Sequence, residues 1–439
     1  MTASTLHYYG QPSTAVSAVQ SSRLAECVLL LFGMLSLGVF EPQYHAVNFN
    51  ELQLGETIAD ISTANPYNQL RWLALAALAC GVVLARGPAE LMRITVRMWP
   101  LFALFAYCLL SALWSDYPMI TLRRSFGLIL PAFSLLVAMV YIGDLRRAAL
   151  ILYLAFWAAL LLNASALPLS SAYDEFGLFR GVLGNKNTLG SVAVPAILVG
   201  LAVGPWLRVP WSRVLRLIYS VAWLAILILS VSRTSWALLL AVPALFIAIS
   251  LASYATRMSF LATSILFFGL GLVSCGIAYG VLGYSPLDLV APGTTLNGRT
   301  EIWSFMAHEI GKSDWILGSG FGAFWGVGYG AANLSSIYEY IHLLNQAHNG
   351  YIDVIASVGV VGLALCLMVF ACAAAASEQF RREDPYLYRL VWFLLLFAFL
   401  HNFMESSALV PFNSVWHLTL FAIVAALVPV PQGRVPWRT

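Results

Sequence analysis

The sequence has few charges and almost no lysine. Only 10% of its 439 residues are Asp, Glu, Lys or Arg, and just two of the 23 basic residues are lysines. An ordinary soluble domain carries about 25% charged residues, and a soluble globule of this size could not bury a composition that is 60% hydrophobic. The composition excludes soluble enzymes, coiled coils and disordered proteins, and it predicts a polytopic membrane protein.

Motifs for metal, disulfide or nucleotide chemistry are also missing. The six cysteines lie in apolar stretches with neither metal-ligand spacing nor a disulfide pattern. No pair of acids is spaced for glycoside hydrolysis, and no cluster of Asp, Glu or His suggests a metal site. The net charge of +3 gives no indication of a nucleic-acid partner. We also see no internal repeat of the kind found in many secondary transporters.

Long apolar runs separated by charges and turn residues predict an all-α fold with about twelve transmembrane helices. We expect a single membrane domain over residues 1–439, with one large outside loop at 283–351 that carries short helices. Residues 217–252 contain only one charge, Arg233, and are either two spans or one bent helix. The expected spans are 24–40, 70–85, 99–114, 125–142, 148–168, 188–205, 217–232, 234–252, 259–282, 352–376, 390–404 and 415–430.

The distribution of arginine predicts the orientation of these spans. With the N-terminus in the cytoplasm, 15 of the 23 Lys and Arg residues fall in inside loops, as the positive-inside rule requires. The first outside loop, 41–69, has four acids and neither lysine nor arginine. We therefore expect both termini inside. We interpret the first apolar run as a retained span, because it has no clear small-residue cleavage site.

Two of the outside arginines are candidate anion ligands. Arg233 stands between two apolar runs near the outer membrane surface, where its charge costs free energy. It either grips a phosphate with its guanidinium fork or snorkels to cap a helical hairpin. Arg299 begins the clearest helix of the large loop, where backbone N–H groups favour an anion; the alternative is a surface ion pair with Glu301. One face of this helix is apolar, with Ile302, Trp303, Met306 and Ile310.

A histidine closes the large loop at the mouth of the next span. His348 could act as a general base near neutral pH, with Asn349 orienting it or the substrate and Asp353 as a candidate partner of the imidazole. The alternative is a histidine at a helix cap or at the lipid interface. His401 and Glu405, four residues apart near the outer end of a later span, are candidates for a minor contact in the site.

An outside loop with two cations and two glycines, from Arg180 to Asn187, is a further candidate. Glycines let a backbone approach a ligand closely, so Arg180 and Lys186 could contact phosphate or sugar. The alternative is a turn before the next span, capped by Asn187. Outward arginines and one histidine on a helical membrane protein suit an anionic, lipid-linked substrate with a good leaving group, such as a diphosphate.

These motifs, in this order, resemble the superfamily of O-antigen ligases and O-antigen or exopolysaccharide polymerases. The resemblance covers roughly residues 110–410, and the motifs fall in the expected topology. Each motif is short, and the ordered set is what makes the resemblance specific. The motifs are Trp114–Pro118, Arg180-Gly181, Gly184–Asn187, Ser232-Arg233, Gly298-Arg299 with Trp303, and His348–Tyr351 before a glycine-rich span.

The resemblance implies an inverting, metal-independent glycosyltransferase of the bacterial inner membrane, with its active site at the periplasmic face and no cofactor. Its donor would be a glycan on undecaprenyl diphosphate, and its acceptor a saccharide hydroxyl. By the same resemblance Arg233 and Arg299 bind the diphosphate, and His348 activates the acceptor hydroxyl. The substrate-binding residues that the matched motifs imply are Arg180, Lys186, Asn187, Trp303, Asn349 and Tyr351.

The superfamily divides by acceptor. Polymerases transfer the glycan to another lipid-linked repeat, and ligases transfer it to lipid A core; the stretch 180–187 looks more like the exopolysaccharide polymerase branch. Two other classes stay open: a transporter of inorganic anions such as bicarbonate, with Arg233 lining its path, and a scaffold for glycan export. Intramembrane acids are nearly absent, which speaks against transport, and a scaffold leaves the outside arginines unexplained.

Overall fold

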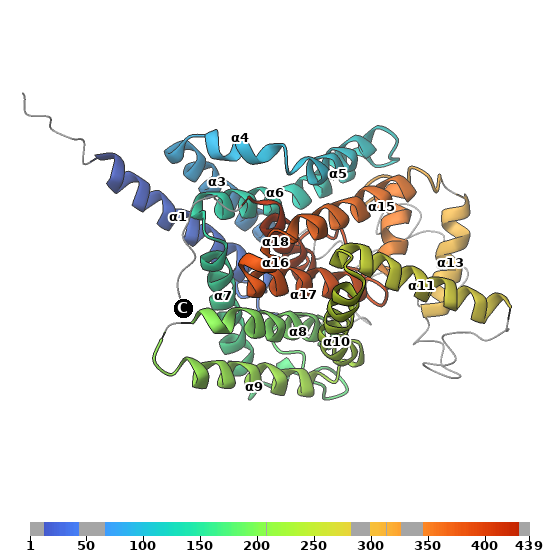
Figure 1. The fold of residues 1–439 in the computed structure, drawn as a ribbon. Helices are drawn as coiled ribbons and strands as arrows, with labels where there is room; N and C mark the ends of the chain where they lie inside the picture. The colour runs from blue at the N-terminus through green and yellow to red at the C-terminus, as the bar shows by residue number, and fades with distance from the viewer. Residues whose placement is uncertain are drawn as a thin grey trace, which may run out of the picture.

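A computed structural model describes residues 13–43, 66–207, 209–281, 299–312, 314–325 and 346–429. Within these ranges the fold is helical, as expected, and the β contact is one isolated bridge between Tyr173 and Phe179. The helices pack into one bundle (Figure 1). They are α1 (Ser13–Ser36), α3 (Pro66–Arg86), α4 (Ala89–Thr95), α5 (Trp99–Leu110), η2 (Ser111–Leu113), α6 (Pro118–Ile142), α7 (Leu145–Ser165), η3 (Ser170–Ala172), α8 (Lys186–Val203), η4 (Gly204–Trp206), α9 (Ser212–Ser230), α10 (Arg233–Thr256), α11 (Phe260–Gly280), α13 (Arg299–Lys312), α15 (Gly350–Ser377), α16 (Phe380–Glu383), α17 (Pro385–His401) and α18 (Ser414–Leu427).

Eight of the described helices are long and apolar enough to cross a membrane, which makes the chain a polytopic membrane protein. They are α3, α6, α7, α8, α9, α10, α11 and α15. A ninth span is counted if α4 and α5 with η2, which are bent by 84° relative to each other, are taken as one. The described chain thus supports eight or nine spans, and the expected twelve are not shown.

Part of the difference comes from helices that are too short to cross a membrane. The expected spans at 390–404 and 415–430 correspond to α17 and α18, which have 17 and 14 residues. At a rise of about 1.5 Å per residue, a helix as short as α18 does not cover a hydrocarbon core of about 30 Å. The first expected span, 24–40, overlaps α1, which ends at Ser36.

Residues 217–252 form two helices and not one. α9 ends at Ser230 and α10 begins at Arg233. Val231 between them has a φ of 50°, a left-handed conformation that a β-branched residue rarely adopts and that a continuous right-handed helix does not contain. The break makes Arg233 the first residue of a helix, which matters for the site below.

The centre of the bundle is formed by α8, α17 and α18. α8 packs on α7, α9, α10 and α17, and α18 packs on α6, α15 and α17. By contrast, α9, α10 and α11 have at most 22% of their most apolar stretch buried. Their exposed leucine, isoleucine and valine side chains suit contact with lipid chains. At one side of the bundle α13 lies beside the start of α15 (Figure 1).

A break in α15 brings the segment 314–325 against the bundle. Gly359, inside α15, has a φ of 68° and a ψ of −176°, a conformation open to glycine and closed to most other residues. The N–H of Val360, which follows the break, donates to the carbonyl oxygen of Trp315 at 3.0 Å. A Cβ at Gly359 would lie 2.0 Å from the carbonyl oxygen of Ile316. The glycine therefore allows the close approach that fixes this segment next to the site.

Candidate active site

Four helices, α8, α10, α13 and α15, begin close to the carboxylate of Glu405. Their first residues are Lys186, Arg233, Arg299 and Gly350. The start of a helix carries partial positive charge from its free N–H groups, and three of these starts add a cationic side chain. The region is therefore built to hold negative charge.

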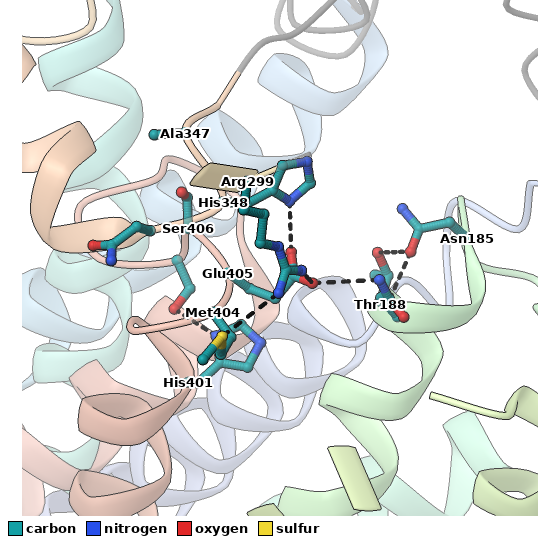
Figure 2. Close-up of polar contacts among 12 residues, drawn as sticks. Asn185, Thr188, Arg299, Ala347, His348, His401, Met404, Glu405 and Ser406 are labelled. Atoms are coloured by element: carbon teal, nitrogen blue, oxygen red, sulfur yellow. Dashed lines mark hydrogen bonds and ion pairs between the residues drawn. The ribbon is translucent and has the colours of Figure 1, made fainter. Parts of the chain in front are cut away.

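Glu405 joins the contacts at this place into one cluster (Figure 2). Its Oε1 accepts a hydrogen bond from Arg299 Nη2 at 2.8 Å and one from Asn187 Nδ2 at 3.3 Å. Its Oε2 lies 3.0 Å from Nδ1 of His348. The side chains of Glu405 and Arg299 are only 11% and 13% exposed, so little water screens their ion pair. The imidazole is thus paired with Glu405, and the expected pairing with Asp353 is wrong.

The carboxyl group of Glu405 is ionised. Burial raises its pKa, but the hydrogen bond and charge of His348 and the charge of Arg299 outweigh burial and hold the pKa below the ordinary value of 4.5. An ionised carboxylate only accepts hydrogen bonds, so Nδ1 of His348 carries the hydrogen that points at Oε2. In the neutral imidazole the lone pair then lies on Nε2, the nitrogen that can take a proton.

The lowered pKa of Glu405 gives a pH-dependent contribution to stability. Such a carboxyl group stabilises the folded protein above the ordinary carboxyl pKa, and this contribution is lost as the pH falls through the lowered value. We expect Glu405→Gln to lower the unfolding temperature at pH 7 and to have less effect as the pH falls below about 4. Tryptophan fluorescence during heating of protein in nanodiscs measures the difference. An equal effect at both pH values would contradict this prediction.

The short loop before α15 presents His348 to the cluster. Asn349 caps α15, and its Oδ1 accepts the backbone N–H of Tyr351 at 3.1 Å. His348 precedes this cap with a left-handed φ of 50°, a region in which histidine is enriched. Gly350 follows, and a Cβ there would lie 1.9 Å from Oδ1 of Asn402. The glycine lets the loop lie directly on the chain segment that carries Glu405.

Asp353 holds the same loop through its backbone. Its carboxylate accepts the N–H of Ala347 at 3.0 and 3.1 Å and the indole N–H of Trp325 at 2.7 Å. The hydroxyl group of Ser406 also donates to it. The carbonyl oxygen of Ala347 accepts the indole N–H of Trp303 at 3.0 Å. Three segments of the chain therefore meet on one half-buried acid, which holds the residue directly before His348.

Replacing Asp353 by alanine is expected to destabilise the protein and to slow its reaction. The change leaves donors of Ala347, Trp325 and Ser406 without their acceptor, and an unpaired buried donor costs about 1–3 kcal/mol. Asp353→Asn keeps one carbonyl oxygen as an acceptor and is expected to have the smaller effect. Thermal unfolding and reaction rate of both variants measure this. An alanine variant as stable as the wild type would show that Asp353 does not hold the loop.

The helix that carries Arg299 is anchored by the apolar face expected from its sequence. Ile302 and Met306 are buried, and Trp303 and Ile310 pack against them. This small core fixes the start of α13 relative to the loop before α15. Its other members are Phe305, Phe324, Trp325, Ala347, Ile352 and Ala356.

Asn187 links the cluster to the start of α10. Its Oδ1 accepts a hydrogen bond from the hydroxyl group of Ser232 at 3.2 Å, while its amide nitrogen donates to Glu405. The expected role of Asn187 as a helix cap is wrong, because α8 is capped by Asn185, whose Oδ1 accepts the N–H of Thr188 at 2.8 Å. The side chain of Asn187 is thereby free to face the cluster.

Arg233 and Lys186 stand at helix starts beside the cluster. Arg233 is exposed and directly follows Ser232, and Lys186 is half-buried and directly precedes Asn187. Both cations are thus one residue away from the hydrogen-bonded chain that leads to Glu405. Their position suits a ligand that extends from the cluster across the starts of α8 and α10.

Arg180 and Tyr351 are engaged with backbone carbonyl groups. Arg180 is 1% exposed, and its guanidinium donates to carbonyl oxygens that include those of Ser171 at 2.6 Å and Leu183 at 2.8 Å. The hydroxyl group of Tyr351 donates to the carbonyl oxygen of Phe399 at 2.7 Å. In this structure Arg180 shapes its loop and Tyr351 ties α15 to α17, and neither side chain reaches the carboxylate.

The central role of Glu405 goes beyond what its sequence position indicates. Spacing suggests that Glu405 shares a helix face with His401, but α17 ends at His401. His401 is buried, with Nδ1 3.2 Å from the hydroxyl group of Ser407. Glu405 lies in the chain after the helix, where it can reach both Arg299 and His348. The feature of the sequence that could have pointed to Glu405 is its position as an acid shortly after the outer end of an apolar helix.

Comparison with known proteins confirms the family resemblance. Residues 218–367 match the model of a family described as O-Antigen ligase. This segment contains Arg233, Arg299 and His348 and ends before Glu405. The chain is also 27% identical over 365 residues to the exopolysaccharide production protein ExoQ of Rhizobium meliloti (strain 1021), a match that covers 77% of this chain and 78% of ExoQ.

Proposed function

We propose that this membrane protein of the O-antigen ligase family transfers a glycan from undecaprenyl diphosphate to a saccharide hydroxyl, at the periplasmic face of the bacterial inner membrane. The observation that carries the proposal is the joining of Arg299 and His348 on Glu405, a phosphate ligand and a general base held by one carboxylate. The reaction inverts the anomeric carbon and uses no metal. Both termini lie in the cytoplasm, so α8, α10 and α15 begin on the periplasmic side.

The donor diphosphate binds where the helix starts converge. Arg299 and the exposed Arg233 provide guanidinium forks that match phosphate oxygens, and the positive ends of the α10 and α13 helix dipoles add to the attraction. When the bond between sugar and phosphate breaks, negative charge grows on the diphosphate. Fixed cations therefore stabilise the transition state more than the bound donor, which is what accelerates a reaction.

The acceptor hydroxyl is activated by His348. The oxygen of the acceptor hydroxyl forms a bond to the anomeric carbon of the donor sugar. At the same time, the bond between that carbon and the phosphate oxygen breaks. The electron pair of the broken bond leaves with the diphosphate, and the hydroxyl proton passes to Nε2 of His348. Glu405 keeps the imidazole in the required tautomer and stabilises the imidazolium that forms. An aspartate has the same role in the catalytic triad of serine proteases.

We infer that the acceptor is another lipid-linked saccharide, so that the protein lengthens a polymer. The match to a protein named for exopolysaccharide production, over most of both chains, favours this acceptor over lipid A core. Ligation of O-antigen to lipid A core is the second form of the same reaction.

A reconstituted assay tests the function. Purified protein in nanodiscs receives only undecaprenyl-diphosphate-linked glycan from its host, with EDTA present, and glycan length is followed on a gel. We expect longer lipid-linked glycan from the wild type. Transfer that starts only when lipid A core is added would make the protein a ligase. Absence of transfer to either acceptor by folded protein would contradict the proposal and would favour anion transport, which a flux assay in vesicles would then measure.

A further inference from the structure

Glu405 forms an ion pair with Arg299, the proposed phosphate ligand. Its Oε1 lies 2.8 Å from Arg299 Nη2, while its Oε2 lies 3.0 Å from His348 (Figure 2). Carboxylate and phosphate offer the same kind of anionic oxygen to a guanidinium. A donor diphosphate that binds Arg299 must therefore compete with Glu405 for it.

The geometry of the ion pair suits such an exchange. Arg299 meets the carboxylate through Nη2 alone, and its Nη1 lies 3.6 Å from the sulfur of Met404, a weak acceptor. This is less than the two parallel bonds that an arginine fork can make with one anion. Asn187 Nδ2, at 3.3 Å from the same Oε1, remains as a donor when the guanidinium turns away. The carboxylate of Glu405 therefore keeps a hydrogen-bond donor after Arg299 has left it.

We propose that Glu405 is an internal counter-ion that the donor diphosphate displaces from Arg299, after which the carboxylate serves His348 alone. This inference rests on the proposed function of the site. Before the exchange, the positive charge of Arg299 weakens the pull of the carboxylate on the imidazole proton. After it, the carboxylate faces the imidazole alone, and its full negative charge stabilises the imidazolium that forms when His348 takes the acceptor proton. Donor binding therefore prepares the base, so that the acceptor is activated only when a donor is present.

The exchange predicts opposite effects of one substitution on binding and turnover. Glu405→Gln removes the competing charge and frees Arg299, so the affinity for undecaprenyl diphosphate, measured by native mass spectrometry in nanodiscs, is expected to increase about 3- to 10-fold. The same variant loses the partner of the imidazole, and kcat of glycan transfer is expected to fall about 100-fold. Tighter binding with slower turnover is a combination that loss of structure does not produce.

A matched control removes a negative charge outside the cluster. Glu175 is exposed in the chain between η3 and α8, and Glu175→Gln is expected to change neither the affinity nor kcat appreciably. If Glu405→Gln fails to fold, Glu405→Asp serves instead. It keeps the charge but shortens the reach to both partners, and it is expected to shift affinity and kcat in the same directions by smaller factors.

The outcomes separate the exchange from the function. Weaker or unchanged binding of undecaprenyl diphosphate by Glu405→Gln would overturn the exchange, because the carboxylate would then not compete with phosphate. A wild type that does not bind this lipid would overturn both the exchange and the proposed function. Tighter binding by the variant, with no glycan transfer by the wild type to any acceptor, would support the exchange and contradict the proposed reaction.

Discussion

Replacing His348 by alanine is expected to lower the rate of glycan transfer by about 10²- to 10⁴-fold, the usual contribution of a general base. The acceptor hydroxyl would then keep its proton as it attacks the anomeric carbon. Affinity for undecaprenyl diphosphate should change little, because the imidazole pairs with Glu405 and is not one of the proposed phosphate ligands. Transfer rate and lipid affinity, measured on the same nanodisc preparation, test this split.

The matched control is a histidine of the same region that lies outside the cluster. His308 is exposed on α13, nine residues after Arg299, and His308→Ala is expected to keep the wild-type rate. A folded His348→Ala protein that transfers glycan at the wild-type rate would show that another group takes the proton. The general-base assignment would then be wrong, while the assignment of the phosphate site would be unaffected.

Replacing Arg299 by alanine is expected to reduce kcat by about 10²- to 10³-fold, as does the loss of one donor from a preorganised anion site. Two effects add. The growing charge on the diphosphate loses a fixed cation, and Glu405 loses the partner that balances its charge next to the substrate. Arg299→Lys restores the charge but not the planar fork, so we expect it to recover only part of the rate. Initial rates at saturating donor measure both variants.

An exposed arginine on the same side of the bundle provides the comparison. Arg123 lies on α6 and is exposed, and Arg123→Ala is expected to leave kcat close to that of the wild type. An Arg299→Ala variant with unchanged kcat and a raised KM would mean that Arg299 only helps to bind the donor. Its contribution would then be equal in the bound donor and the transition state.

The helical fold and the segments that carry the site follow from the sequence because they depend on local patterns. The apolar face of α13 repeats at helical spacing, and Ile302 and Met306 are buried as that spacing predicts. The number of spans does not follow in the same way, because hydropathy continues past the point where a helix ends. α17 stops at His401 although the apolar residues Phe403 and Met404 follow closely, and α18 stops at Leu427 although Val428 follows.

The site follows from the sequence only in part, because its centre depends on contacts between distant segments. Arg299 and His348 stand out as a cation and a base in an outside loop. Glu405 is 106 and 57 residues away from them, and no local spacing connects an acid to such partners. Asp353 illustrates the same limit, since its nearness in sequence suggests the imidazole while the fold gives it the backbone of Ala347.

The measurement that tests the central claim most directly is a cryo-electron microscopy structure of the wild type in nanodiscs with its undecaprenyl-diphosphate-linked glycan. The account predicts density for the diphosphate within hydrogen-bond reach of Arg299 and Arg233, at the starts of α10 and α13. It also predicts that Nε2 of His348 faces the anomeric carbon. Glu405 should still contact the imidazole but should no longer form an ion pair with Arg299. Phosphate density at another place, with the ion pair between Arg299 and Glu405 intact, would contradict it.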